Sequence, residues 1–135
     1  MNKIFIVADG ACSGNPGPAG VGITLEYNGR MKKISKYIGH GTNNIAELMS
    51  IKLALEEIKV RNIPVEIKTD SQYCIGILSQ NWKANANQQL VAETRRLCAE
   101  FDEIVFVKVK GHSGHAGNDI VDKLAVAAYQ PYLNK

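Results

Sequence analysis

The feature that most restricts the fold is the Asn28-Gly29 pair, which separates two segments of alternating apolar and polar residues. Together they span residues 21–39, VGITLEYNGRMKKISKYIG. Asn-Gly is the strongest short-range signal for a two-residue β-hairpin turn, because both turn positions need a positive φ. A third segment, KIFIVA at residues 3–8, predicts a buried strand that ends at Asp9. The chain is therefore expected to begin with three antiparallel strands, with a Gly- and Pro-rich loop at residues 10–20.

From Asn44 the apolar residues follow a helical period instead. Leu48, Ile51, Leu55 and Ile58 share one face of this helix, and the RNIP segment at residues 61–64 closes it. The remaining elements are expected as a strand at 65–70, helices at 71–80 and 87–101, a strand at 103–109, and a last helix at 119–130 with Pro131 just beyond. The order βββαβααβα predicts an α/β fold in which helices flank a mixed five-stranded sheet. A chain of 135 residues is expected to form one domain over residues 1–135.

The composition leaves a nucleic-acid partner open and argues against several other classes of protein. A net charge of +3 and a pI near 8.8 permit nucleic-acid binding without requiring it. The three cysteines have no C-x-x-C spacing, so neither a disulfide framework nor a zinc knuckle is indicated. The N-terminal apolar run is too short for a signal peptide, and no run approaches the length of a membrane span. We expect a cytoplasmic protein with reduced thiols and no membrane association.

Four acids stand beside predicted strands and helices. Taken one at a time, they are most simply explained as helix caps. Asp70 precedes a helix, Glu47 follows Asn44 by three residues as in a capping box, and Asp122 stands in the same relation to an acid before it. Asp9 fits this explanation worst, because it follows a strand and precedes small loop residues where no helix needs a cap.

A shared role becomes plausible if the strands ending at Asp9 and Asp70 are parallel neighbours. Their axes would then lie about 4.8 Å apart. Two carboxylates that close repel each other unless a cation lies between them. Two divalent ions about 3.5–4 Å apart could be held there, with Glu47 and Asp122 completing the ligand set. Ligation by oxygen alone selects Mg²⁺ or Mn²⁺ over zinc.

The segment KGHSGHAGNDIVDKLA, at residues 110–125, places two histidines three residues apart. A zinc hydrolase built on His112 and His115 would need a third nitrogen or sulfur ligand, and the only other histidine is His40. The loop at residues 10–20 lacks the G-K-[ST] ending of a P-loop. Neither a zinc site nor a nucleotide cradle is therefore indicated.

Four segments resemble the motifs of the type 1 ribonuclease H family in their order and spacing: ADGACSGNPGPAGVGI, TNNIAELMSIKLAL, IKTDSQY and VKGHSGHAGNDIVDKLA. The resemblance runs from about Lys3 to Ala128, and each segment carries one of the four acids. It implies the ribonuclease H-like fold and an endonuclease that hydrolyses the RNA strand of RNA/DNA hybrids, leaving 5′-phosphate and 3′-hydroxyl ends. A non-catalytic nucleic-acid-binding module on the same fold is the alternative, and the presence of all four acids argues against it.

The resemblance also implies roles for single residues. Asp9, Glu47, Asp70 and Asp122 match the family's metal-binding carboxylates, which would hold two Mg²⁺ ions, with Mn²⁺ as a substitute. His112 matches a loop histidine associated with proton handling and product departure, whereas the second histidine is expected to be a bystander.

Further positions resemble the family's contacts to the hybrid. They approach its backbone, its phosphates and 2′-hydroxyl groups, or its minor groove. These candidate nucleic-acid contacts are Cys12, Asn15, Thr42, Asn43, Asn44, Gln72 and Asn118.

The chain departs from larger members of the family, which carry a handle rich in Lys, Arg and Trp in the middle of the fold. Here the corresponding segment, NWKANANQQ at residues 81–89, offers only one Trp and one Lys, as in handle-less members of retroviral and prokaryotic type. Fewer phosphate contacts predict weaker binding to the hybrid. Lys32, Lys33 and Lys36, or Arg95 and Arg96, could compensate, although a merely solvated basic face is the commoner use of such clusters. We expect a monomer without an obligate protein partner.

Overall fold

A computed structural model describes residues 2–110 and 116–133 of the chain. The strands are β1 (Ile4–Cys12), β2 (Gly17–Tyr27), β3 (Arg30–Gly41), β4 (Val65–Thr69) and β5 (Ile104–Lys108). The helices are α1 (Asn43–Glu56), α2 (Gln72–Ser79), α3 (Gln88–Ala99) and α4 (Ala116–Tyr129), followed by a short 3₁₀ turn, η1 (Gln130–Tyr132). The predicted order of elements is confirmed.

The five strands form one mixed sheet in the order β3-β2-β1-β4-β5. The first three strands are antiparallel to one another, whereas β4 runs parallel to both β1 and β5. The β2–β3 hairpin turns at Asn28 and Gly29, which have φ values of 52° and 79°, as the Asn-Gly pair predicts. The mixed sheet of the α/β fold is therefore as expected from the sequence.

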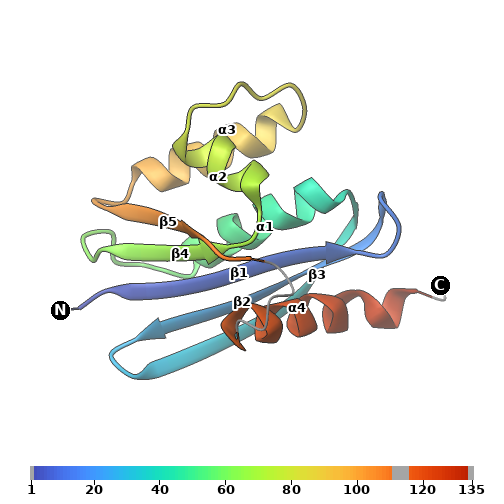
Figure 1. The fold of residues 1–135 in the computed structure, drawn as a ribbon, viewed down its shortest axis with the longest axis horizontal. Helices are drawn as coiled ribbons and strands as arrows, with labels where there is room; N and C mark the ends of the chain where they lie inside the picture. Colours follow the sequence, from blue (N-terminus) through green and yellow to red (C-terminus); the bar gives the residue numbers. More distant parts are fainter. Residues whose placement is uncertain (1, 111–115, 134–135) are drawn as a thin grey trace.

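Helices cover both faces of the sheet (Figure 1). α1 packs against β1 and β2, and α3 packs against α1 on the same side. α4 packs on the opposite face, against β1, β2 and β3. The main core lies between the sheet and α1, where Ile6, Ile23 and Ile67 meet Leu48 and Ile51. Among the described residues, no helix has both the length and the apolar character that a membrane span requires.

Two boundaries predicted from the sequence were wrong. The residues expected to form a loop at 10–20 mostly belong to β1 and β2, which leave only residues 13–16 as a turn. The Gly and Ala residues there pair as strand backbone, because their small side chains suit places where helices approach the sheet closely. The last helix also begins earlier than expected, at Ala116.

Candidate active site

Asp9 and Asp70 meet where the parallel pairing of β1 and β4 ends. The last paired residues of the two strands are Val7 and Lys68, and each acid comes two residues later. The sequence predicted that the strand ends at Asp9, and this was wrong. β1 continues to Cys12 along its antiparallel partner β2. The two strands are nevertheless parallel neighbours, which is the condition under which the sequence pattern brings Asp9 and Asp70 together.

Glu47 reaches the same point from α1. Its Oε1 accepts a 2.6 Å hydrogen bond from the backbone N–H of Gly10, and only 7% of the residue is exposed. A Cβ atom at Gly10 would lie 2.1 Å from the carbonyl carbon of Ala46, so any larger residue would push α1 away from β1. The glycine after Asp9 thus permits the contact that places Glu47 beside it.

Asp122 approaches from α4 on the other face, again at a glycine. Gly22 pairs with Asp9 across the β1–β2 ladder. A Cβ atom on Gly22 would lie 1.9 Å from the carbonyl oxygen of Val121, the residue before Asp122. The bare backbone of β2 therefore lets α4 come close enough for the carboxylate of Asp122 to raise the pKa of Asp9.

The capping explanations for these acids do not hold in the structure. α2 is capped by Ser71, whose Oγ accepts from Cys74 N at 3.1 Å, rather than by Asp70. α1 is capped by Thr42, whose Oγ1 accepts from Ile45 N at 3.2 Å, so Glu47 has no part in a capping box with Asn44. α4 starts six residues before Asp122, which places that acid beyond the first turn of the helix. None of these three acids therefore caps the helix that the sequence assigned to it.

The acids form a group that could hold a metal ion. One carboxylate oxygen from each of Asp9, Glu47 and Asp70 lies within 4.8 Å of the others. Asp70 Oδ1 is buried and has no hydrogen-bond partner within the described part of the chain. A buried acceptor without a donor fits a site for a cation. An all-oxygen set of this kind suits a hard divalent ion such as Mg²⁺ or Mn²⁺.

The electrostatics of the cluster also favour a bound cation. The pKa of Asp9 is raised to about 7, chiefly by burial and also by repulsion from Asp70 and Asp122, against the lowering effect of a hydrogen bond with Glu47. The pKa of Glu47 is raised as well, first by burial and then by the charge of Asp9. At an effective dielectric constant near 20, two full charges about 4.8 Å apart repel by roughly 3 kcal/mol. A divalent ion would turn this repulsion into attraction.

Several predicted nucleic-acid contacts gather in one pocket near the start of α1. Its lining includes Asn15, Thr42, Asn43 and Asn44, and Asn15 Oδ1 accepts from Asn43 N at 2.9 Å. The pocket is completed by Asn87, which precedes α3 and has a φ of 57°. The sequence interpretation missed Asn87, because nothing in its local sequence indicates that α3 begins beside α1.

The other predicted contacts are spread along the same end of the sheet. Cys12 is half-buried in the last position of β1, and Gln72 is exposed at the first position of α2. Asn118 is only 2% exposed, which suits a role in positioning the start of α4 better than direct contact with a nucleic acid. His112, together with His115, lies outside the described residues.

Comparison with known proteins places this geometry in context. The family model for RNase H matches residues 1–130. The chain is 38% identical to the ribonuclease H of Desulforamulus reducens, with 98% of this chain and 92% of that protein covered. It is 39% identical to the ribonuclease H of Legionella pneumophila, with 91% and 94% covered.

Solved structures of ribonucleases H are also similar to this chain. RNase H1 from the halophilic archaeon Halobacterium salinarum superposes with a TM-score of 0.80 at 31% identity, over 93% of this chain and 96% of that one. The structure of LC11-RNase H1 in complex with an RNA/DNA hybrid gives a TM-score of 0.84 at 28% identity, over 96% and 99%. The likeness therefore covers nearly the whole of each chain.

Proposed function

This chain belongs to the ribonuclease H family, and we propose that it is a metal-dependent endoribonuclease that cleaves the RNA strand of RNA/DNA hybrids. The observation that carries the proposal is the cluster of Asp9, Glu47 and Asp70 where the parallel pairing of β1 and β4 ends, with carboxylate oxygens within 4.8 Å of one another. A nucleic-acid-binding module without catalytic activity would have no use for such a repulsive group of buried acids.

In this proposal the four carboxylates hold two divalent ions. Asp9, Glu47, Asp70 and Asp122 are the ligands, Mg²⁺ is the expected ion, and Mn²⁺ is a substitute. When bound, such ions supply a nucleophile derived from water at neutral pH and stabilise the charge on the leaving oxygen. The protein supplies the four ligands from β1, α1, the end of β4 and α4, which lie on both faces of the sheet, so that the carboxylates need little rearrangement.

The remaining side chains would choose and orient the substrate. The amides that line the pocket at the start of α1 suit the 2′-hydroxyl groups that distinguish RNA from DNA, because an amide can both donate and accept hydrogen bonds. His112 would handle a proton as the products form and depart. Cleavage in this way leaves 5′-phosphate and 3′-hydroxyl ends.

The decisive experiment offers the purified protein three end-labelled substrates: an RNA/DNA hybrid, an RNA duplex and a DNA duplex. We expect cleavage of the RNA strand of the hybrid with Mg²⁺ and none after EDTA is added. If the hybrid stays intact with both Mg²⁺ and Mn²⁺, the proposed activity is wrong. Analysis of the cut ends checks the predicted 5′-phosphate.

Three broader expectations are part of the same proposal. The chain acts as a single catalytic domain, as a monomer, and in the cytoplasm. Light scattering coupled to gel filtration tests the monomer, with a mass near 14.8 kDa as the expected result. A tagged copy followed by cell fractionation tests the location.

A further inference from the structure

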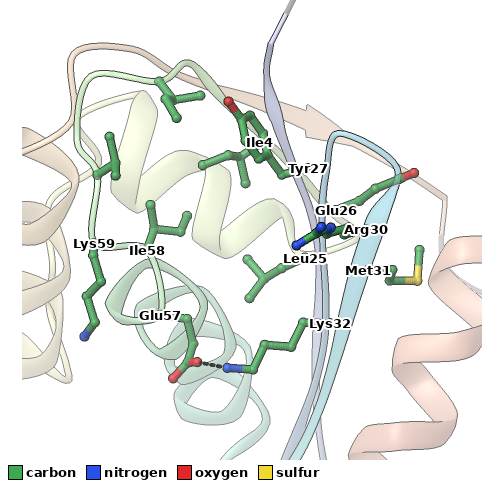
Figure 2. Close-up of a pocket in the computed structure, with 12 residues that line it drawn as sticks. Ile4, Leu25, Glu26, Tyr27, Arg30, Met31, Lys32, Glu57, Ile58 and Lys59 are labelled. Carbon is green, nitrogen blue, oxygen red and sulfur yellow. Dashed lines mark hydrogen bonds and ion pairs between the residues drawn. The ribbon is translucent and has the colours of Figure 1, made fainter.

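Two of the basic side chains that the sequence offers as substitutes for a handle, Lys32 and Arg95, have partners elsewhere in the protein. Lys32 forms an ion pair with Glu57 on the wall of an apolar pocket (Figure 2). Glu57 comes ten residues after Glu47, which corresponds to about 15 Å along a helix. Lys32 therefore lies far from the acid cluster, towards the other end of α1.

Arg95 is exposed, but its guanidinium forms hydrogen bonds within the protein. It donates to Ile77 O at 2.9 Å and to Trp82 O at 2.6 Å, which ties α3 to α2 and to the segment after α2. A Cβ atom at Gly76 would lie 2.2 Å from the ring of Trp82, so this ring packs directly on the glycine. Larger family members carry a basic handle at this place. This chain has a short linker instead, and Arg95 donates a hydrogen bond to its backbone.

Two other lysines lie directly beside the acid cluster. Lys108 is the last residue of β5 and pairs with Thr69, the residue before Asp70. The backbone continues alongside β4, because Val109 N donates to Thr69 O at 2.9 Å. Lys108, Val109 and Lys110 line one surface pocket together with Asp70, and both lysines are exposed. None of the ion pairs in the described part of the chain involves Lys108.

The position of this pair relative to the acids is informative. In the sheet, β5 lies beside β4 on the side away from β1, so the lysines flank Asp70 on the side opposite Asp9. The amide pocket lies on the Asp9 side, since Asn15 belongs to the β1–β2 turn and Asn43 follows β3. Neighbouring strands are about 4.8 Å apart, so a lysine side chain on β5 can reach a group held over Asp70. A nucleic acid that crosses the acids would meet amides on one side and two ammonium groups on the other.

We propose that Lys108 and Lys110 bind backbone phosphates of the hybrid next to the cleavage site, and that this contact replaces part of the missing handle. The inference rests on the proposed function. A lysine binds phosphate as a point charge, so the contact adds affinity without reading sequence. It also opposes the repulsion that the carboxylate of Asp70 would exert on a nearby phosphate.

The test is the double variant Lys108→Gln/Lys110→Gln, compared with Lys3→Gln/Lys59→Gln. The control removes the same number of charges at the opposite end of the sheet, before β1 and after α1. Cleavage of the hybrid is measured from 50 to 200 mM salt, and binding of a fluorescent hybrid is measured by anisotropy. We expect KM and Kd to rise at least fivefold in the test variant, with kcat nearly unchanged. The slope of log Kd against log salt should become shallower by about 2, or about 1 for each lost phosphate contact.

The variant Lys108→Arg/Lys110→Arg should keep the affinity, because the positive charges remain. The proposal is overturned if the glutamine variant matches the control in KM, Kd and salt slope, or if kcat falls while KM stays unchanged. If the wild type cleaves the hybrid and the glutamine variant gives either of these results, the proposed function still holds and only the role of the two lysines is wrong. If the wild type does not cleave, the anisotropy comparison still decides whether the two lysines bind the hybrid.

Discussion

At the scale of the residue, the geometry of the acid cluster depends on two glycines next to Asp9. Gly10 follows Asp9 in the chain, and Gly22 pairs with it across the β1–β2 ladder. Each lets a helix touch the sheet backbone, α1 on one face and α4 on the other. Glu47 and Asp122 therefore reach Asp9 because the strand residues near it carry no side chains.

The first prediction concerns the acids themselves. Asp9→Asn and Asp70→Asn each remove one ligand charge, and we expect kcat/KM for the hybrid to fall by about 1,000-fold or more, equivalent to about 4 kcal/mol of transition-state stabilisation. Asp102→Asn is the matched control, since this exposed acid lies before β5 and outside the cluster. Wild-type turnover in either test variant would show that the site has been assigned to the wrong residues.

The second prediction separates the two histidines. His112→Ala should slow turnover by up to about 100-fold without abolishing it, because general acid–base assistance is only part of the rate enhancement. His115→Ala is the natural control and should change kcat much less. Steady-state rates over a range of pH measure both effects, and a loss at His115 equal to that at His112 would contradict the choice between them.

At the scale of the element, the close contact of β1 with α1 accounts for the position of Glu47. The helix meets the strand at Gly10, and its start is fixed by the Thr42 cap and by Asn43 N donating to Asn15 in the first hairpin turn. α1 is thus tied to the β1–β2 hairpin at its start through Asn15 and one turn later through Gly10. This arrangement couples the amide pocket to the acid cluster through one rigid helix.

The third prediction tests that contact. Gly10→Ala places a methyl group 2.1 Å from the backbone of Ala46, and we expect the free energy of unfolding to fall by at least about 2 kcal/mol. Gly41→Ala is the control, because its methyl group would meet only Ile45 Cγ2 at 3.4 Å, an ordinary contact. Urea denaturation measures both variants. If the two variants have equal free energies of unfolding, α1 can move away from β1 without loss of stability, and the prediction is wrong.

At the scale of the whole molecule, the acid cluster links stability to pH and to metal. Since the pKa of Asp9 is raised to about 7 in the folded protein, the folded state holds a proton that the unfolded state has lost above about pH 4. Without metal, stability should therefore decrease as the pH rises from about 4 to 7. A bound divalent ion stabilises the ionised carboxylates and so removes this loss of stability.

The fourth prediction follows from this linkage. In EDTA, the wild type should lose up to about 1.4 kcal/mol of stability per pH unit from Asp9 between about pH 4 and 7, and Asp9→Asn should lose less. Adding Mg²⁺ at neutral pH should stabilise the wild type by about 2.7 kcal/mol at a concentration 100-fold above its Kd. Thermal melts across pH measure both effects. If the stability of Asp9→Asn and that of the wild type depend on pH in the same way in EDTA, Asp9 does not contribute to the pH dependence and the prediction is wrong.

The sequence by itself determined the order of elements and the hairpin at Asn28. Both follow from local rules, namely the alternation of apolar residues and the positive φ that Asn-Gly accepts. The parallel pairing of the two strands that carry Asp9 and Asp70 was a condition of the metal-site hypothesis, and the tertiary structure meets it. The sequence also indicated which acids are candidates, because four of them recur at the ends of predicted strands and helices. It was misleading at residues 10–20, where a Gly-rich composition suggested a loop.

Only the tertiary structure decided which chemical role each candidate is placed to play. The caps at Thr42 and Ser71 removed the capping explanation for Glu47 and Asp70, and this depended on the residue at which each helix begins. Asn87 joined the amide pocket, and Lys108 and Lys110 came to lie beside Asp70, through contacts between segments distant in the chain. Such contacts depend on how helices and strands approach one another, which is set by packing at glycines such as Gly10 and Gly22 and leaves no local periodic signal.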